Sequence, residues 1–142
     1  MEQHSSDRPA PRFDMIGMVT DDMPATLAFY RRLGLDIPAG ADGEQHVEVV
    51  GPGGVRIGWD TVEVIRTMDP DYRMPTGAGR VSLAFRCADA SDVDRVYREL
   101  TEAGHHGERA PWDAFWGQRY AVVLDPNGNG VDLFAPLDRA SD

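Results

Sequence analysis

Three large aromatic residues, Trp112, Phe115 and Trp116, lie close together near the C-terminal end of the chain, and Gly117 follows them directly. Flat organic molecules stack on such rings, and a glycine lets the backbone bend so that a ring can turn outwards. Trp59 is another tryptophan, at the end of a predicted strand. These four aromatics predict a site for a planar hydrophobic ligand. Burial in the core or in a dimer interface is the open alternative, because aromatics bury large areas wherever they lie.

Few other side chains have the types and spacing that nucleophilic chemistry needs. The chain contains no lysine, which excludes Schiff-base catalysis and a phosphate-loop lysine. Cys87 has no adjacent histidine, and Ser82 lacks the Gly-Xaa-Ser-Xaa-Gly sequence of an activated serine. We therefore interpret Cys87 as a structural thiol, and no catalytic residue is assigned.

The aromatic residues precede a predicted β-hairpin. Gln118–Leu124 is rich in residues that favour strands, and the turn Asp125-Pro126-Asn127-Gly128-Asn129 follows it. Proline, asparagine and glycine each supply backbone angles that tight turns require. Gly130–Phe134 can then return as an antiparallel strand.

Strand and helix patterns occur twice in the same order, which predicts two βαβββ modules and an α+β fold. The first module has an apolar strand at Phe13–Thr20 and a helix over Asp22–Gly34, with Asp22 as its N-terminal cap. Three short strands follow it, at 35–38, 45–50 and 55–60. The second module has a strand over 80–87, a helix over 91–104, a short strand over 108–110 and the hairpin.

This repeat predicts a single domain over residues 13–136. Module one covers about 13–60 and module two 79–136, joined by a linker over 61–78 that contains prolines and glycine. A short helix over 61–68 is an open alternative within this linker. We expect residues 1–12 to form a flexible N-terminal tail and residues 137–142 to form a second tail.

Composition narrows the class of protein. The chain has 142 residues and a formal net charge of −10, which argues against nucleic-acid binding. A single cysteine excludes an internal disulfide and fits a reducing compartment. The N-terminus lacks the apolar segment of a signal peptide, and no apolar run is long enough to span a membrane. We expect a cytoplasmic protein without a membrane partner.

The hairpin resembles the last two strands of the glyoxalase/bleomycin resistance/dioxygenase superfamily, also called the vicinal oxygen chelate (VOC) superfamily. The residues that carry this resemblance are Trp116-Gly117, the turn over 125–129 and Asp132, and the first helix with Phe29-Tyr30 and Leu33-Gly34 is similar as well. The resemblance covers about residues 13–136. It implies a half-barrel cavity formed by two βαβββ modules, and a homodimer.

The resemblance also identifies the positions at which metal-using members hold a divalent ion. Met15, Ser82, Asp132 and either Ile57 or Gly58 occupy these positions here. A thioether, a hydroxyl and one carboxylate make a poor site for such an ion. His46 lies on a predicted strand away from these positions, and His4, His105 and His106 do not complete a site. We therefore expect no metal and no cofactor.

These observations favour a metal-independent binding protein for a small aromatic or hydrophobic molecule, resembling the antibiotic-sequestering resistance proteins. An enzyme is the second hypothesis: a lyase, isomerase or dioxygenase of the VOC type that uses a divalent metal. A structural or regulatory dimer with a vestigial cavity is the third. For the first hypothesis the predicted ligand-binding residues are Trp116, Trp59, Trp112, Phe115, Met15, Ser82, Asp132 and Phe134.

Overall fold

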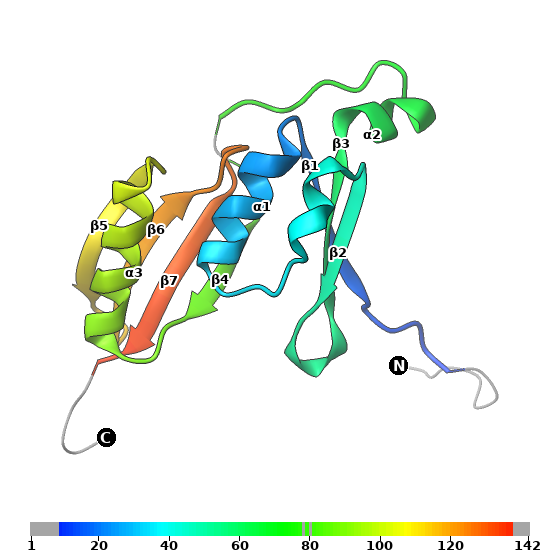
Figure 1. Cartoon of the computed structure of the whole chain (residues 1–142). Coiled ribbons are helices and arrows are strands. Elements are labelled where there is room, and N and C mark those ends of the chain that lie inside the picture. The colour runs from blue at the N-terminus through cyan, green and yellow to red at the C-terminus, as the bar shows by residue number, and fades with distance from the viewer. Residues whose placement is uncertain (1–8, 78, 80, 138–142) are drawn as a thin grey trace.

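Two open β-sheets, one from each half of the chain, organise the molecule (Figure 1). The structure is a computed structural model and describes residues 9–77, 79 and 81–137. The first sheet has the order β1-β3-β2, with β1 at Met15–Thr20, β2 at His46–Val50 and β3 at Arg56–Thr61. The second sheet has the order β4-β7-β6-β5, with β4 at Ser82–Arg86, β5 at Gly107–Ala114, β6 at Gln118–Leu124 and β7 at Gly130–Pro136.

Three α-helices connect these strands: α1 (Met23–Arg32), α2 (Val62–Met68) and α3 (Ala90–Glu102). The carboxylate of Asp22 caps α1 by accepting a hydrogen bond of 3.1 Å from the Ala25 amide. Asp89 caps α3 in the same way, through the amide of Asp92 at 2.8 Å. Gly34 ends α1 with a φ of +96°, a value that glycine adopts without steric cost. Among the described residues no helix combines the length and apolar character needed to cross a bilayer.

Both halves share one pattern of strand pairing, which confirms the predicted α+β fold of two related modules. In each half the first strand pairs in parallel with the last strand, as β1 does with β3 and β4 with β7. The remaining pairs are antiparallel. Neither sheet closes into a barrel.

The prediction of a strand at Leu35–Pro38 was wrong, because these residues form neither a strand nor a helix. The first sheet therefore has one strand fewer than the second. The Arg31 side chain donates hydrogen bonds to the carbonyl oxygens of Ile37 (3.0 Å) and Pro38 (2.6 Å). These carbonyls are therefore satisfied without a neighbouring strand. A short 3-10 helix at Ala39–Gly43 follows.

The strand that we predicted at 108–110 is longer, since β5 continues to Ala114 and contains Trp112. Pro111 lies within β5 and has no amide hydrogen to donate to a neighbouring strand. An edge strand tolerates this loss, and β5 is at the edge of its sheet. The pairing with β6 shifts register between Arg109 and Trp112, on either side of this proline.

The predicted tails lie largely outside the described residues. Residues 1–8 and 138–142 are not described, and residues 9–12 are exposed without regular structure. The segment predicted as a linker begins with α2, which the hydroxyl of Thr61 caps through the Val64 amide at 3.3 Å. Residues 69–77 then continue without a helix or strand.

The core contains one face of each sheet and the helices against it. On the second sheet Ala121, Val123, Val131 and Leu133 are fully buried, and α3 packs against β6 and β7. On the first sheet Trp59 is fully buried, and its ring contacts Tyr30 of α1 at a centroid distance of 5.1 Å. The other face of each sheet carries no helix (Figure 1).

Asp125 connects the two halves of the chain through a buried carboxylate that is only 4% exposed. Tyr30 of α1 donates a hydrogen bond of 2.7 Å to this carboxylate, and Asn129 donates one of 2.8 Å from its side chain. The amides of Asn127 and Asn129 donate two more. Asn127 also bonds to Thr20 and Thr26 in the first half, so the hairpin turn is held against β1 and α1.

We predict that Tyr30→Phe lowers the free energy of unfolding by about 1.5–3 kcal/mol, the usual range for a hydrogen bond to a charged group. The substitution removes one donor to Asp125 and leaves the buried ring in place. Urea denaturation measures the change. Tyr72→Phe is the matched control, since the Tyr72 hydroxyl bonds only to the Met74 sulfur, at 3.7 Å, among the described residues. Equal stability of the two variants would contradict the prediction.

Candidate functional site

The open face of the second sheet carries the side chains that alternate with its buried residues. Tyr120, Val122 and Leu124 point away from α3, because Ala121 and Val123 between them are buried beneath it. Across the ladder, Tyr120 pairs with Trp112 of β5 on one side and with Phe134 of β7 on the other. An aromatic row therefore runs across three strands.

Trp112, Phe115, Trp116, Tyr120 and Phe134 form what we call the aromatic cluster. The centroid of Tyr120 lies 5.5 Å from that of Trp112, 5.3 Å from that of Trp116 and 6.3 Å from that of Phe134. Most of these contacts are edge-to-face, and the rings of Tyr120 and Phe134 are stacked. Edge-to-face contacts hold the rings in position and leave part of the ring faces free to contact another molecule.

Trp116 lies in the turn between β5 and β6 and is 48% exposed. The amide of Gly117 donates to the Ala114 carbonyl at 3.0 Å, and Gly117 has a φ of +92° that favours glycine. The indole nitrogen donates to the side chain of Gln118 at 2.8 Å, which orients the ring. Phe115 in the same turn is 96% exposed, so this turn does not complete the core.

Asp132 lies next to the aromatic cluster on β7. The Tyr120 hydroxyl donates a hydrogen bond of 2.5 Å to its carboxylate. Burial, this hydrogen bond and the charge of Asp132 together raise the pKa of Tyr120 to about 12, so the hydroxyl stays protonated near neutral pH. A hollow of about 230 Å³ lies beside this pair, and its lining includes Ser82, Glu108, Val122 and Leu124.

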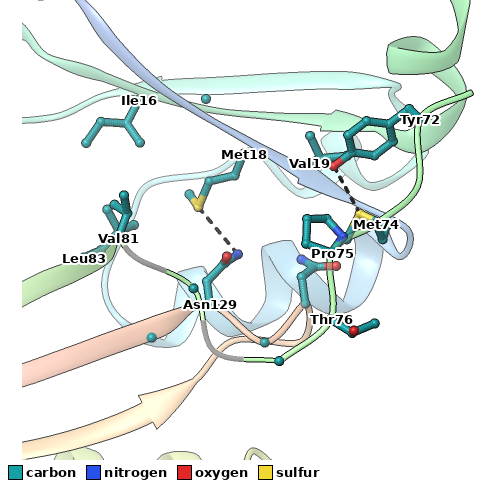
Figure 2. Close-up of a pocket in the computed structure, with 16 residues that line it drawn as sticks. Ile16, Met18, Val19, Tyr72, Met74, Pro75, Thr76, Val81, Leu83 and Asn129 are labelled. Atoms are coloured by element: carbon teal, nitrogen blue, oxygen red, sulfur yellow. Dashed lines mark hydrogen bonds between the residues drawn. The ribbon is translucent and has the colours of Figure 1, made fainter. Parts of the chain in front are cut away.

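A larger cavity of about 400 Å³, which we call the seam pocket, lies between β1 and β4 (Figure 2). Met18 and Val19 of β1 line one side, and Leu83 of β4 lines another. The segment from Tyr72 to Gly77 covers part of the pocket, and the turn over 127–130 completes it. The seam pocket and the hollow share Gly79, Val81, Gly128 and Gly130, so the two spaces adjoin.

The predicted ligand-binding residues lie in three different places: the open face of the second sheet, the core, and the open face of the first sheet. The open face of the second sheet and its turn bring together Trp112, Phe115, Trp116, Ser82, Asp132 and Phe134. Trp59 is fully buried in the core, where its indole nitrogen has no hydrogen-bond partner among the described residues. A fully buried indole offers no surface to a ligand, so we leave Trp59 out of the site.

Met15, also a predicted ligand-binding residue, lies on the open face of the first sheet. A Cβ atom on Gly58 would lie 3.2 Å from the Met15 sulfur, so this side chain covers Gly58. Tyr120 was missed because its ring was assigned only to a strand. Side chains alternate between the two faces of the predicted strand 118–124, and the hairpin sets this strand beside Asp132. Together these signals could have placed Tyr120 on the same face as Asp132.

The residues at the family's metal positions do not fit a divalent ion. Gly58, rather than Ile57, shares the open face with Met15, which settles the register left open by the sequence. The set is therefore a thioether, a glycine, the Ser82 hydroxyl and the Asp132 carboxylate, and Asp132 already accepts from Tyr120. No group of three His, Cys, Asp or Glu side chains in the described part of the chain could hold a metal.

The open face of the first sheet carries a charged network of Asp14, His46, Glu48, Arg56 and Asp60. His46 contacts Asp60 through Nδ1 at 2.6 Å and Glu48 through Nε2 at 2.7 Å. Arg56 contacts Glu48 and Asp14. The two carboxylates lie at opposite nitrogens of the imidazole, so they do not converge on a common ion. This network was not predicted from the sequence, which placed His46 on a strand away from the metal positions.

One family model matches most of the chain. Residues 12–133 match the Glyoxalase/Bleomycin resistance protein/Dioxygenase superfamily. The chain is 28% identical over 125 residues to an uncharacterized protein of Mycolicibacterium smegmatis, covering 88% of this chain and 94% of that protein.

Solved structures show the same fold. A glyoxalase/bleomycin resistance protein/dioxygenase family enzyme from Burkholderia phytofirmans PsJN superposes with a TM-score of 0.76 at 22% identity, covering 89% of this chain and all of that one. A glyoxalase/bleomycin resistance protein/dioxygenase from Nocardioides gives 0.70 at 24% identity, covering 92% and 87%. At these identities the likeness shows the fold alone.

We predict that His46 makes the stability of the chain depend on pH. Hydrogen bonds to Glu48 and Asp60 raise its pKa in the folded chain, so folding favours the protonated ring. This contribution is complete below the unfolded pKa, about 6.5, and is lost as the pH rises through the folded pKa. His46→Gln should therefore cost more stability at pH of about 5.5 than at about 9. Urea unfolding at both pH values measures this, and a pH-independent cost would contradict it.

Proposed function

Because the chain belongs to the Glyoxalase/Bleomycin resistance protein/Dioxygenase superfamily, we propose that it binds a planar hydrophobic small molecule without a metal. In this proposal it resembles the antibiotic-sequestering members of the family. The observation that carries the proposal is the aromatic cluster on the open face of the second sheet. Five aromatic residues gather there, and Trp116 and Phe115 keep large exposed surfaces.

Trp116 is the main stacking platform in this proposal. Its ring is oriented by the hydrogen bond to Gln118 and by edge contacts with Trp112 (6.1 Å) and Tyr120 (5.3 Å). A platform that is already ordered loses little conformational entropy when a flat ligand binds. A stacked pair contributes about 0.5–1.5 kcal/mol beyond the burial of apolar area. Burial adds roughly 25 cal/mol per Å².

The remainder of the ligand lies along the open face, past Asp132 and towards the seam pocket. Asp132 offers a carboxylate whose orientation the Tyr120 hydroxyl fixes. The seam pocket, at about 400 Å³, falls within the usual volume range of small-molecule sites. Its lining combines apolar side chains such as Met18 and Leu83 with the amide of Asn129. An apolar cavity with few polar groups suits a drug-sized organic molecule.

The competing function is a metal-dependent lyase, isomerase or dioxygenase. Such an enzyme needs a donor set that holds a divalent ion against water. The described residues offer only Asp132 as a carboxylate ligand at the family's positions, beside the Met15 thioether and the Ser82 hydroxyl. A hard cation prefers several oxygen ligands, and imidazole suits transition metals. The chemistry of the side chains therefore favours binding over metal catalysis.

We predict that Trp116→Ala weakens the binding of a flat aromatic probe by at least about tenfold, equivalent to about 1.4 kcal/mol. Acridine is a suitable probe, since it is planar, neutral near neutral pH and fluorescent. The loss follows from removal of the exposed stacking surface. Titration of the probe, followed by fluorescence anisotropy, measures the dissociation constant.

The melting temperature of Trp116→Ala should stay close to that of the parent chain, because the indole is half exposed. Phe13→Ala is the control, since Phe13 is an exposed aromatic that precedes β1 in the first half of the chain. A large drop in melting temperature would show that Trp116 is structural. Unchanged acridine binding would place the stacking site elsewhere.

We also predict that protein purified without chelators or added metal holds no stoichiometric zinc, iron, nickel or manganese. The prediction follows from the donor set of Met15, Gly58, Ser82 and Asp132. Mass spectrometric metal analysis of the purified protein, beside a chelator-treated sample, measures this. One equivalent of a transition metal per chain would favour the enzyme instead.

A further inference from the structure

Arg109 covers one face of Trp112 in the aromatic cluster. The central carbon of its guanidinium lies 3.7 Å from the centroid of the indole ring. Arg109 is exposed, and within the part of the chain that the structure describes no carboxylate pairs with it. The stack on Trp112 is therefore the interaction that orients this side chain. It lies where β5 shifts its register, between Arg109 and Trp112.

A guanidinium is itself a flat, delocalised cation, and it stacks on aromatic faces for that reason. The contact shows that one face of the half-buried Trp112 accepts a guanidinium at 3.7 Å from the ring centroid. The other rings of the cluster contact Trp112 edge-on, at 6.1 Å for Trp116 and 5.5 Å for Tyr120. Arg109 thus occupies a stacking face that the cluster would otherwise present to a ligand.

The carboxylate of Asp132 is connected to the Trp112 ring through a single residue, Tyr120. Tyr120 contacts Trp112 through its ring and donates its hydroxyl to Asp132. Glu108 lines the same hollow as Asp132. A positively charged ligand group stacked on Trp112 would therefore lie on the same open face as the Asp132 carboxylate, with Tyr120 between them. Arg86 lies at the opposite end of the aromatic row, across from Phe134, and makes an anionic ligand the alternative to be tested.

We propose that Arg109 occupies, in the ligand-free chain, the place of a planar cationic group of the ligand, and that this group displaces Arg109 from Trp112 on binding. The inference rests on the proposed function and names its ligand class: a flat aromatic molecule with a delocalised positive charge. An exposed cation–π contact is weak, so a ligand can displace it at small cost. Arg109 then acts as an internal competitor that lowers the affinity of the site.

Three acridines of the same ring system test the charge preference. Acridine is neutral near neutral pH, 9-aminoacridine carries a delocalised positive charge, and acridine-9-carboxylate is an anion. Fluorescence titration of the parent chain should give the tightest binding for 9-aminoacridine and the weakest for the carboxylate. Equal affinities for the three probes, or tightest binding of the anion, would overturn the inference.

Arg109→Gln tests the competitor directly. It should tighten the binding of 9-aminoacridine by about two- to fivefold, the equivalent of one exposed cation–π contact. Arg98→Gln is the matched control, because it removes the same charge from α3, which covers the opposite face of this sheet. Arg109→Lys keeps the charge and removes the flat guanidinium, so part of the gain should persist. Unchanged or weaker binding of 9-aminoacridine by Arg109→Gln, or an equal gain in Arg98→Gln, would overturn the inference.

The outcomes separate this inference from the function on which it rests. If acridine binds and Trp116→Ala weakens it, the proposed function stands, whatever Arg109→Gln does. If in that case the three probes bind alike and Arg109→Gln changes nothing, the inference alone fails. If no acridine binds to the parent chain or to either Arg109 variant, both fail.

Discussion

The buried carboxylate of Asp125 is the interaction on which the arrangement of the two sheets depends. A carboxylate that is 4% exposed is costly unless donors surround it, and here the donors come from both halves of the chain. The Tyr30 hydroxyl donates to Asp125 from α1, and the backbone amides of Asn127 and Asn129 donate to it from the hairpin turn itself. The same turn supplies Asn127 and Asn129 to the seam pocket. The cavity between the sheets is thus shaped by a bond network that also holds the sheets together.

The second constraint is that each sheet has only one face covered by helices. Because side chains alternate along a strand, burial of Ala121 and Val123 beneath α3 forces Tyr120 and Val122 onto the other face. The packing of the core therefore decides which residues a ligand can meet. The two open faces differ in character: aromatic rings gather on the second sheet, whereas the charged network with His46 lies on the first. The apolar open surface is therefore the one on the second sheet.

Local patterns predicted the hairpin, the helices and the family, because caps, turns and periodicity are encoded within a few residues. The predictions that failed depended on contacts distant in sequence or on the identity of a neighbour. Leu35–Pro38 has no strand because Arg31 satisfies its carbonyls, and β5 extends past Pro111 because it lies at an edge. Trp59 was grouped with the other tryptophans by residue type, and only its contact with Tyr30 shows that it belongs to the core.

In the function proposed here, Asp132 serves another chemistry than it does in the metal-using members of the family. The resemblance places an acidic residue in this strand as a metal ligand, and that role requires further donors around it. Here the neighbouring positions are Met15, Gly58 and Ser82, and the partner of Asp132 is the Tyr120 hydroxyl. Because the pKa of Tyr120 is raised to about 12, the hydroxyl remains a donor and the carboxylate keeps its orientation. A carboxylate fixed by a phenol beside a row of aromatic rings is suited to orient an organic ligand. Stacking alone fixes the orientation of a ligand only weakly, whereas a hydrogen bond to the carboxylate fixes it in one direction.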